Sequence, residues 1–462
     1  MKLLTDVSKY MFILLLLLFT LRNFTYFRKH DEEKRRKTEG KQAADIILFD
    51  ILGFIIIFLH TFRFETLILL IGVIVYTAAT IAFYRLLYKG CSLLLINNML
   101  LLLSIGFVIL ARLDLSKALK QYVIAAAGTV LALFVPVIVR KLRILPRLTW
   151  IYAGVGVLCL LGVMALAVTS GGAKLSIEIG GVTVQFSELV KITFVFFMAA
   201  QLSRSTSFGS VAVTSAVAAV HVGILVLSTD LGTALVFFIA YLVMVLVATR
   251  KPWYSAAALA AGAAASVAAY YLFGHVRQRV EAWLDPFAVY DSSGYQIVQG
   301  LFGISAGSWF GSGLGEGMPG KIPVAAKDFI FAAICEEFGV VFGISLILVC
   351  MTMFLLIVNI SIEIRRPFYK LIAIGLGTEY AFQVFLTIGG VTKFIPMTGI
   401  TLPLVSYGGS SVICTILMLA IVEGLYILRE DEGEIIEKEK RKRERARRNA
   451  ASEEKDLGGG GA

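Results

Sequence analysis

Charged residues are scarce in this chain of 462 residues. Asp, Glu, Lys and Arg together make up 16% of it, whereas apolar residues make up 58% and the mean hydropathy is +0.83. Soluble proteins usually contain about 45–50% apolar residues. Two or three soluble domains would fit the length but are excluded by this composition, which indicates a membrane protein with many spans.

Cysteine and histidine are also few. The five cysteines are scattered, mostly through apolar runs, and form no Cys-x-x-Cys pair. The four histidines lie far apart and show no spacing typical of metal ligands. We therefore interpret the cysteines as small core residues and predict no metal site built on histidine.

The chain has a formal net charge of +11, from 43 basic and 32 acidic residues. The C-terminal tail, Arg429 to Ala462, contributes nothing to this excess, because it holds ten basic and ten acidic residues. The excess therefore lies in the membrane domain and its short loops, where Lys and Arg mark the cytoplasmic side. It indicates topology and does not favour a nucleic-acid partner.

Apolar runs long enough to cross a bilayer, which takes about 20 residues, occur thirteen times. The predicted segments are 9–27, 44–62, 65–88, 93–113, 119–139, 148–169, 187–203, 208–228, 231–249, 254–273, 328–359, 367–390 and 404–428. The first has a short apolar part, yet a cleaved signal peptide is disfavoured because basic residues, and no small-residue cleavage site, follow it.

Basic clusters set the expected orientation. They occur at 28–41, 85–89, 140–147, 250–251, 365–370 and in the tail, and all fall on one side if every segment crosses. That side is expected to be cytoplasmic. Thirteen crossings place the N-terminus outside and the tail inside. If the first segment lies in the membrane interface instead, twelve crossings remain and the N-terminus moves inside.

Two outer loops, 170–186 and 275–327, are long, and loops of such length are usually functional or disordered. The apolar content of the second argues against disorder. The tail, 429–462, is almost continuously charged and is predicted to be disordered, with a solvated helix as the alternative. Lys440–Arg448 carries seven basic residues and one acid, so contact with anionic lipid is a further option.

Ionisable residues inside membrane segments are costly and usually have a function or a partner. Glu188 and Lys191 are three residues apart and share a helix face, which favours a structural ion pair over direct contact with a substrate. Asp230 stands between two apolar runs, where it either caps the following helix or acts in a cavity.

Asp328 is the most informative acid, because it lies where the long outer loop meets the eleventh segment. Its apolar neighbours are expected to raise its pKa and Lys327 to lower it. Such a carboxylate can act as a general base on a sugar hydroxyl, with helix capping as the alternative. Further along, helix breakers and small hydroxyl residues in 396–411 indicate irregular backbone that lines a cavity.

These segments resemble the SEDS family of bacterial shape, elongation, division and sporulation proteins (FtsW, RodA and SpoVE). The matching positions follow the family's order over about residues 90–428. They are Gly172–Lys174; Gln185, Ser187, Glu188 and Lys191; Asp230–Thr233; Leu284–Phe287; Gly294–Gln299; Gly311 with Gly313–Gly315; Pro323; Asp328–Phe331 with Glu336, Glu337 and Gly339; and Thr398–Ser411.

The resemblance implies an all-α polytopic membrane protein with a ten-helix core. We expect about three extra N-terminal helices in 1–90, the core in 91–428 with its extracytoplasmic loop 275–327, and the tail in 429–462 as a cytoplasmic segment. The chain looks like a divergent member, with Phe186 where proline is usual and with Val324 and Ala326 in place of the usual Glu and His.

The function implied is that of a peptidoglycan glycosyltransferase that polymerises lipid II at the outer face of the cytoplasmic membrane. The family works with a class B penicillin-binding protein, a transpeptidase. Asp328 matches the family's catalytic Asp, and Glu188 and Lys191 match a structural ion pair. We predict four substrate-binding residues: Lys174, Asp230, Arg279 and Lys321.

No cofactor motif is present, and Mg²⁺ or Mn²⁺ stays open as a cofactor. Four acids could gather around such an ion near the pyrophosphate of the substrate: Asp285, Asp291, Glu316 and Asp328. Arg277, Arg279, Lys321 and Lys327 are alternative partners for the pyrophosphate, and we prefer Arg279 and Lys321.

Two other functions stay open at this point. One is a flippase for lipid II or another polyprenyl-linked sugar. A transporter is expected to show repeated halves and acids at the bilayer midplane, and the chain shows no internal repeat. The other is a non-catalytic scaffold for a cell-wall synthase, in which Asp328 could be replaced without consequence. The sequence does not decide between elongation, division and sporulation.

Overall fold

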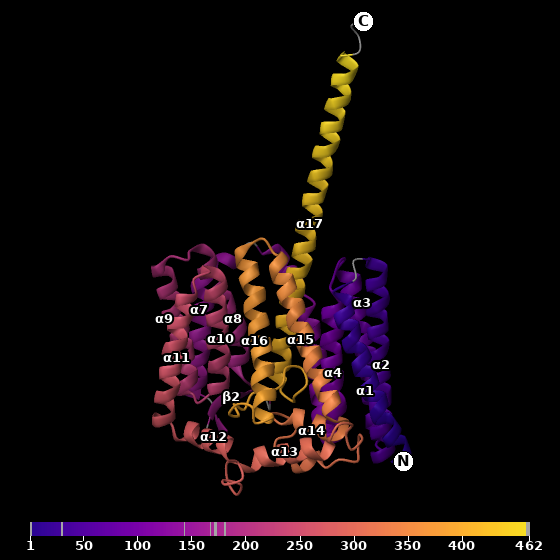
Figure 1. Ribbon diagram of the computed structural model, residues 1–462, viewed down its shortest axis with the longest axis vertical. Coiled ribbons are helices and arrows are strands. Elements are labelled where there is room, and N and C mark those ends of the chain that lie inside the picture. The colour runs from indigo at the N-terminus through magenta and orange to yellow at the C-terminus, as the bar shows by residue number, and fades with distance from the viewer. Residues whose placement is uncertain are drawn as a thin grey trace.

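The structure is a computed structural model that describes residues 2–28, 31–142, 144–166, 168–170, 173–179 and 182–458, with side chains described outside 166–184 and 434–458. The chain forms a bundle of roughly parallel helices, with smaller elements gathered at one end (Figure 1). It is an all-α polytopic membrane protein apart from one small sheet.

Within the described residues, twelve stretches of helix are long and apolar enough to cross a membrane. They are α1 (Lys2–Tyr26), α2 (Glu32–Thr61), α3 (Phe64–Leu87), α4 (Leu93–Leu113), α5 (Leu115–Ala132) with α6 (Val135–Lys141), α8 (Phe186–Arg204), α9 (Phe208–Leu227), α10 (Leu231–Thr249), α11 (Pro252–Leu272), α15 (Val340–Glu363), α16 (Pro367–Val391) and the first half of α17 (Gly409–Gly458). The shorter apolar helix α7 (Thr149–Leu166) is the thirteenth segment expected from the sequence.

The eleventh predicted segment, 328–359, is not one helix. It divides into α14 (Ile330–Phe338) and α15, with Gly339 between them at a φ of +88°. A Cβ on Gly339 would lie 2.4 Å from the Gly311 nitrogen, so only glycine fits where the loop backbone crosses this joint. Because α14 and α15 are both apolar, a prediction from hydropathy alone reads them as one continuous segment.

The two ends of the bundle differ. The N-terminus, α12 (Gly274–Leu284), α13 (Tyr295–Gly307) and α14 lie at one end, and the charged extension of α17 leaves from the other (Figure 1). Short 3₁₀ turns at Leu145–Arg147 and Pro319–Lys321 complete the connections. At the first end, β1 (Val168–Ser170), β2 (Ala173–Ile179) and β3 (Val182–Val184) form an antiparallel sheet in that order.

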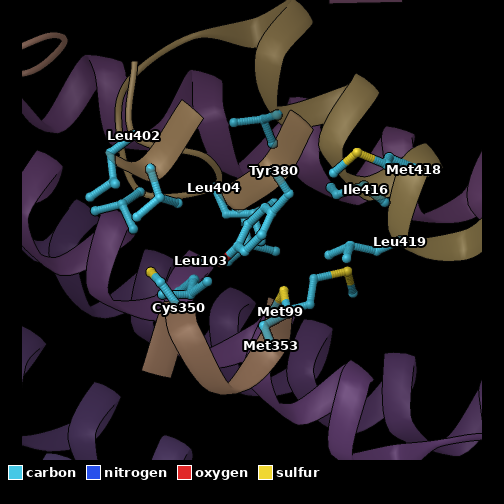
Figure 2. Packing of buried hydrophobic residues seen from close by; sticks show 14 of the residues in the cluster. Met99, Leu103, Cys350, Met353, Tyr380, Leu402, Leu404, Ile416, Met418 and Leu419 are labelled. Atoms are coloured by element: carbon cyan, nitrogen blue, oxygen red, sulfur yellow. The ribbon is translucent and has the colours of Figure 1, made fainter. Parts of the chain in front are cut away.

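The core lies around α4, whose apolar stretch is buried throughout, as expected of a helix that is apolar on every side. Tyr380 of α16 packs there among side chains from four other parts of the chain (Figure 2). These are Met99 and Leu103 of α4, Cys350 and Met353 of α15, Leu402 and Leu404 of the loop before α17, and Ile416, Met418 and Leu419 of α17. The loop is thus held at the end of a packed core.

The tail, for which the sequence left disorder and a solvated helix open, has helical backbone as far as Gly458. At its base, Arg140 lies 2.6 Å from Asp431 and Arg366 lies 2.8 Å from Glu432. These pairs attach the first charged turn of the tail to the connections at that end of the bundle.

Candidate active site

Asp328 lies in the turn that precedes α14 and is partly buried. Burial raises the pKa of its carboxyl to about 6, and the nearby Lys327 and Arg279 oppose that rise. A pKa close to neutral pH is where a general base is most effective.

Arg279 of α12 reaches the loop that precedes α17. Its Nη1 donates to the carbonyl oxygen of Thr398 at 3.2 Å. Gly399 has a φ of +77°, and a Cβ placed there would lie 3.9 Å from both Arg279 Nη2 and Asp328 Oδ2. The guanidinium and the carboxylate therefore converge on the Gly399 backbone from two different elements.

Asp230, at the start of α10, lies close to the turn formed by residues 398–400. It caps α10, since its Oδ1 accepts from the Thr233 N–H at 3.2 Å, and Oδ2 accepts from the Ser187 hydroxyl at 3.3 Å. Burial raises the pKa of Asp230, while its charge acts on Arg279. Capping is thus confirmed, and a part in substrate binding stays a prediction.

A Cβ on Gly232 would lie 2.6 Å from the Ile400 side chain and 3.2 Å from the Thr398 carbonyl oxygen, so α10 packs directly on this turn. The end of α10, α12 and the turn before α14 therefore meet at residues 398–400. The result is a small cluster of two carboxylates and one guanidinium, Asp230, Asp328 and Arg279, at the end of the bundle opposite to the tail.

Hydrogen bonds to distant helices hold the 396–411 loop in place. Gln121 of α5 donates to the Ser406 carbonyl oxygen at 2.9 Å and accepts from the Gly408 N–H at 3.1 Å. The Ser406 hydroxyl donates to the Lys327 carbonyl oxygen at 2.6 Å, next to Asp328. The loop is thus linked directly to the turn that carries Asp328. These hydrogen bonds satisfy backbone N–H and C=O groups of the loop, as irregular backbone at membrane depth requires.

Glu188 and Lys191 of α8 lie 2.8 Å apart and are both buried. Lys191 Nζ also donates to Gln383 Oε1 at 2.6 Å, and Gln383 donates in turn to the Thr401 carbonyl oxygen at 3.0 Å. Glu188, Lys191 and Gln383 line, together with Glu379, a small cavity that has about the room a single water molecule needs. The ion pair is therefore connected to the 396–411 loop through Gln383.

Glu337 of α14 is fully buried and anchors residues 311–320 between α13 and α14, which we call the glycine-rich loop. Its Oε1 accepts from Arg112 Nε at 2.9 Å and its Oε2 from the Gly315 N–H at 3.1 Å. Burial raises the pKa of Glu337 to about 7, and the Arg112 guanidinium opposes this rise. Arg112 also donates to the Gly317 carbonyl oxygen at 3.0 Å, so one ion pair connects α4, α14 and the loop.

Other predicted residues lie apart from the cluster. Lys321 is exposed in its 3₁₀ turn, and Arg277 lies over the Tyr270 ring at 5.8 Å. Lys174 belongs to β2, and its side chain lies outside the described residues. Of the four cations considered for the pyrophosphate, Arg279 and Lys327 are thus the two whose charges act on Asp328.

The four acids considered for a divalent cation do not gather. In the part of the chain that the structure describes, no three His, Cys, Asp or Glu side chains are grouped as metal ligands would be. The charged groups that act on Asp328 are two cations, Lys327 and Arg279, which disfavour a bound cation there. These residues do not fit a metal ion.

Sequence reasoning missed Arg112 and Gln383 as supports of the site, whereas Gly399 falls in the 396–411 stretch that the sequence predicts to line a cavity. Arg112 carried a detectable signal, because an arginine near the end of an otherwise apolar helix needs a partner. Gln383 carried none, since its contact with Lys191 joins positions 192 residues apart.

Comparison with known proteins gives a consistent result. Residues 85–430 match the family model of cell cycle proteins named for FtsW, RodA and SpoVE. The peptidoglycan glycosyltransferase RodA of Mycobacterium bovis is 37% identical over 360 residues, covering 71% of this chain and 76% of that protein. The probable peptidoglycan glycosyltransferase FtsW of Bacillus subtilis is 30% identical over 290 residues, covering 59% and 71%.

Solved structures are similar as well. A chain from a peptidoglycan synthase complex, studied for the coordination of polymerisation and crosslinking, matches with a TM-score of 0.65 and 26% identity, covering 74% of this chain and 99% of that one. The rod-shape-determining protein RodA of Thermus thermophilus matches with a TM-score of 0.55 and 26% identity, covering 73% and 97%.

Proposed function

This chain belongs to the FtsW/RodA/SpoVE family of cell cycle proteins and is a peptidoglycan glycosyltransferase, and from that premise we propose that it polymerises lipid II with Asp328 as the general base. The observation that carries the proposal is the placement of Asp328. It is a partly buried carboxylate with a pKa of about 6, beside Arg279, at the end of the bundle away from the basic connections.

The chemistry is a displacement at the sugar carbon that carries the pyrophosphate. Asp328 takes the proton from the 4-hydroxyl of the N-acetylglucosamine on the acceptor lipid II. That oxygen bonds to the anomeric carbon of the donor sugar, whose bond to the pyrophosphate oxygen breaks, and undecaprenyl pyrophosphate leaves. General-base catalysis of this kind contributes about 10²–10⁴-fold to the rate.

Arg279 serves as the main contact for the pyrophosphate of the donor. A guanidinium presents paired N–H groups that suit phosphate oxygens. Only Nη1 of Arg279 donates to Thr398, and we assign the other N–H groups of the guanidinium to the pyrophosphate. Asp230 orients Arg279 through its charge. Lys321, and Lys174 from the sheet, are assigned to the more distant parts of the substrate.

The protein is a multi-pass membrane protein, and we place Asp328 on the extracytoplasmic side of the cytoplasmic membrane. The support is the position of the basic connections and the tail at the opposite end of the bundle, because Lys and Arg accumulate on the cytoplasmic side (Figure 1). This topology puts the N-terminus outside and the tail in the cytoplasm.

The proposed organisation has three parts: additional helices in 1–90, the catalytic core in 91–428 and the cytoplasmic tail in 429–462. The proposed partner is a class B penicillin-binding protein, which crosslinks the new strands. A related chain has been solved within a peptidoglycan synthase complex, which supports a partner of this kind.

The test uses purified protein with its transpeptidase partner and labelled lipid II. The proposal predicts glycan polymer from the wild type and a loss of at least about 10²-fold in rate for Asp328→Asn. In parallel, vesicles report movement of lipid II across the bilayer. Translocation by the wild type without polymer would contradict the proposal and favour a flippase, and equal polymer from both proteins would remove Asp328 from the mechanism.

A further inference from the structure

The helices α1, α2 and most of α3 precede the part of the chain that matches the family, which begins at residue 85. A buried polar network attaches α1 and α2 to the core. Asn23 donates to Asn98 at 2.7 Å and to Thr352 at 3.0 Å, and Gln42 donates to Asn23 at 2.7 Å. Because these groups are buried in a membrane domain, separating the helices would leave several polar atoms unsatisfied.

Near the middle of the same helices, α1 and α2 contact the joint between α14 and α15. The Phe12 ring of α1 lies edge-on to that of Phe338, with centroids 5.0 Å apart, and 5.2 Å from that of Phe49 of α2. Phe338 stacks on Phe342 at 4.7 Å. We call these four rings the aromatic cluster, and all of them are buried.

The helices α1 and α2 also contact the glycine-rich loop. Thr5 donates to Glu316 at 3.5 Å, and the Tyr10 ring lies 5.6 Å from that of Phe310. His60, in the last turn of α2, lies so close to Gly315 that a Cβ on that glycine would be 2.7 Å from the imidazole. The N-terminal helices thus pack against the same loop that Glu337 anchors.

The helix α14 connects the aromatic cluster to the proposed catalytic site. Phe338 is its last residue, and Asp328 stands two residues before its first. A helix of nine residues is about 13 Å long, so a tilt of about 5° around Phe338 moves the other end by roughly 1 Å. A displacement of that size can cost about 10²-fold in rate.

We propose that α1 and α2 position the catalytic carboxylate, with Phe12 as the positioning residue that holds α14 against the glycine-rich loop. The inference rests on the proposed function of Asp328 and adds to it a role for helices outside the matched part of the chain. It makes the N-terminal segment part of the enzyme and not only a membrane anchor.

The test compares Phe12→Ala with Phe19→Ala. Phe19 is a matched control, because it is equally buried on α1 but lies two turns from Phe12, nearer the polar network. The first readout is alkylation of Cys335, a buried free thiol on α14, followed by mass spectrometry in the full-length protein. Burial raises the pKa of Cys335 to about 12, so its reaction is slow until α14 loosens.

The proposal predicts alkylation of Cys335 about tenfold faster in Phe12→Ala than in Phe19→Ala, because only the first releases the end of α14. The second readout is lipid II polymerisation, which falls at least tenfold in Phe12→Ala alone and recovers in Phe12→Leu. The acid limb of the rate also moves to lower pH in Phe12→Ala, as a more hydrated Asp328 titrates at lower pH.

Equal alkylation of Cys335 in the two variants would overturn the proposal, whatever their turnover. Altered alkylation with equal turnover would also overturn it, since α14 would then move without effect on the site. A wild type that makes no polymer contradicts the proposed function instead, and the alkylation result still decides whether α1 holds α14.

Discussion

Replacing Arg279 by Gln removes a cation that acts on Asp328. Each group lies 3.9 Å from the position of a Gly399 Cβ, so the two are within twice that distance of each other. Because Arg279 opposes the rise in the pKa of Asp328, its removal raises that pKa further above about 6. A base must be ionised to act, so the acid limb of the rate is expected to move to higher pH.

The size of the movement follows from Coulomb's law. Two unit charges about 8 Å apart interact by about 0.5 kcal/mol in water and by about 2 kcal/mol at an effective dielectric constant of 20. These energies correspond to a rise of about 0.4–1.5 pKa units. A rise of about one unit reduces the ionised fraction of Asp328 at pH 6 from about a half to about a tenth, and leaves it nearly unchanged at pH 8.5.

The assay is the initial rate of lipid II polymerisation from pH 5 to pH 9 at saturating substrate. Arg277→Gln is the matched control, because Arg277 is an exposed arginine on the same helix that lies over Tyr270. The reasoning is refuted if the acid limb of Arg279→Gln stays in place or moves to lower pH, or if Arg277→Gln moves it equally.

Three further substitutions test the supports of the site, with thermal unfolding in detergent as the common measurement. Glu188→Gln destabilises the protein by about 3–5 kcal/mol, since the buried charge of Lys191 then loses the carboxylate with which it forms an ion pair. Adding Lys191→Met restores part of that loss; additive effects of the two substitutions would show that the pair is not coupled. Glu337→Gln costs about 1–3 kcal/mol and lowers turnover, because Arg112 and the glycine-rich loop lose their anchor; unchanged unfolding would contradict this. Gly399→Ala costs about 1–2 kcal/mol from its positive φ and slows turnover, whereas a wild-type rate would show that this backbone does not shape the site.

The membrane segments could be predicted from the sequence because each one is a long apolar run bounded by charges or turns. The break at Gly339 could not, because its need for glycine comes from the Gly311 backbone, which only the folded chain brings there. The start of α1 could not be predicted either. The helix begins at Lys2, seven residues before the predicted segment, because its first turns contain polar residues that do not contribute to an apolar run.

The proposed site was partly predictable. Asp328 and Asp230 were indicated by the rarity of acids beside apolar runs, and Arg279 was only one of four cations considered as partners of the pyrophosphate. Its contact with Thr398 joins residues 119 positions apart, so no local pattern could single it out. The aromatic cluster was hidden for a related reason, because in an apolar chain Phe12 looks like any lipid-facing phenylalanine.

The central claim is that Asp328 acts as the base in polymerisation of lipid II. The most direct measurement compares the polymerisation rates of Asp328→Asn and Asp291→Asn, where Asp291 is an exposed acid in the same outer segment. The account predicts a loss of about 10²–10⁴-fold for Asp328→Asn alone, with both variants folded. Similar rates for the two variants would contradict it.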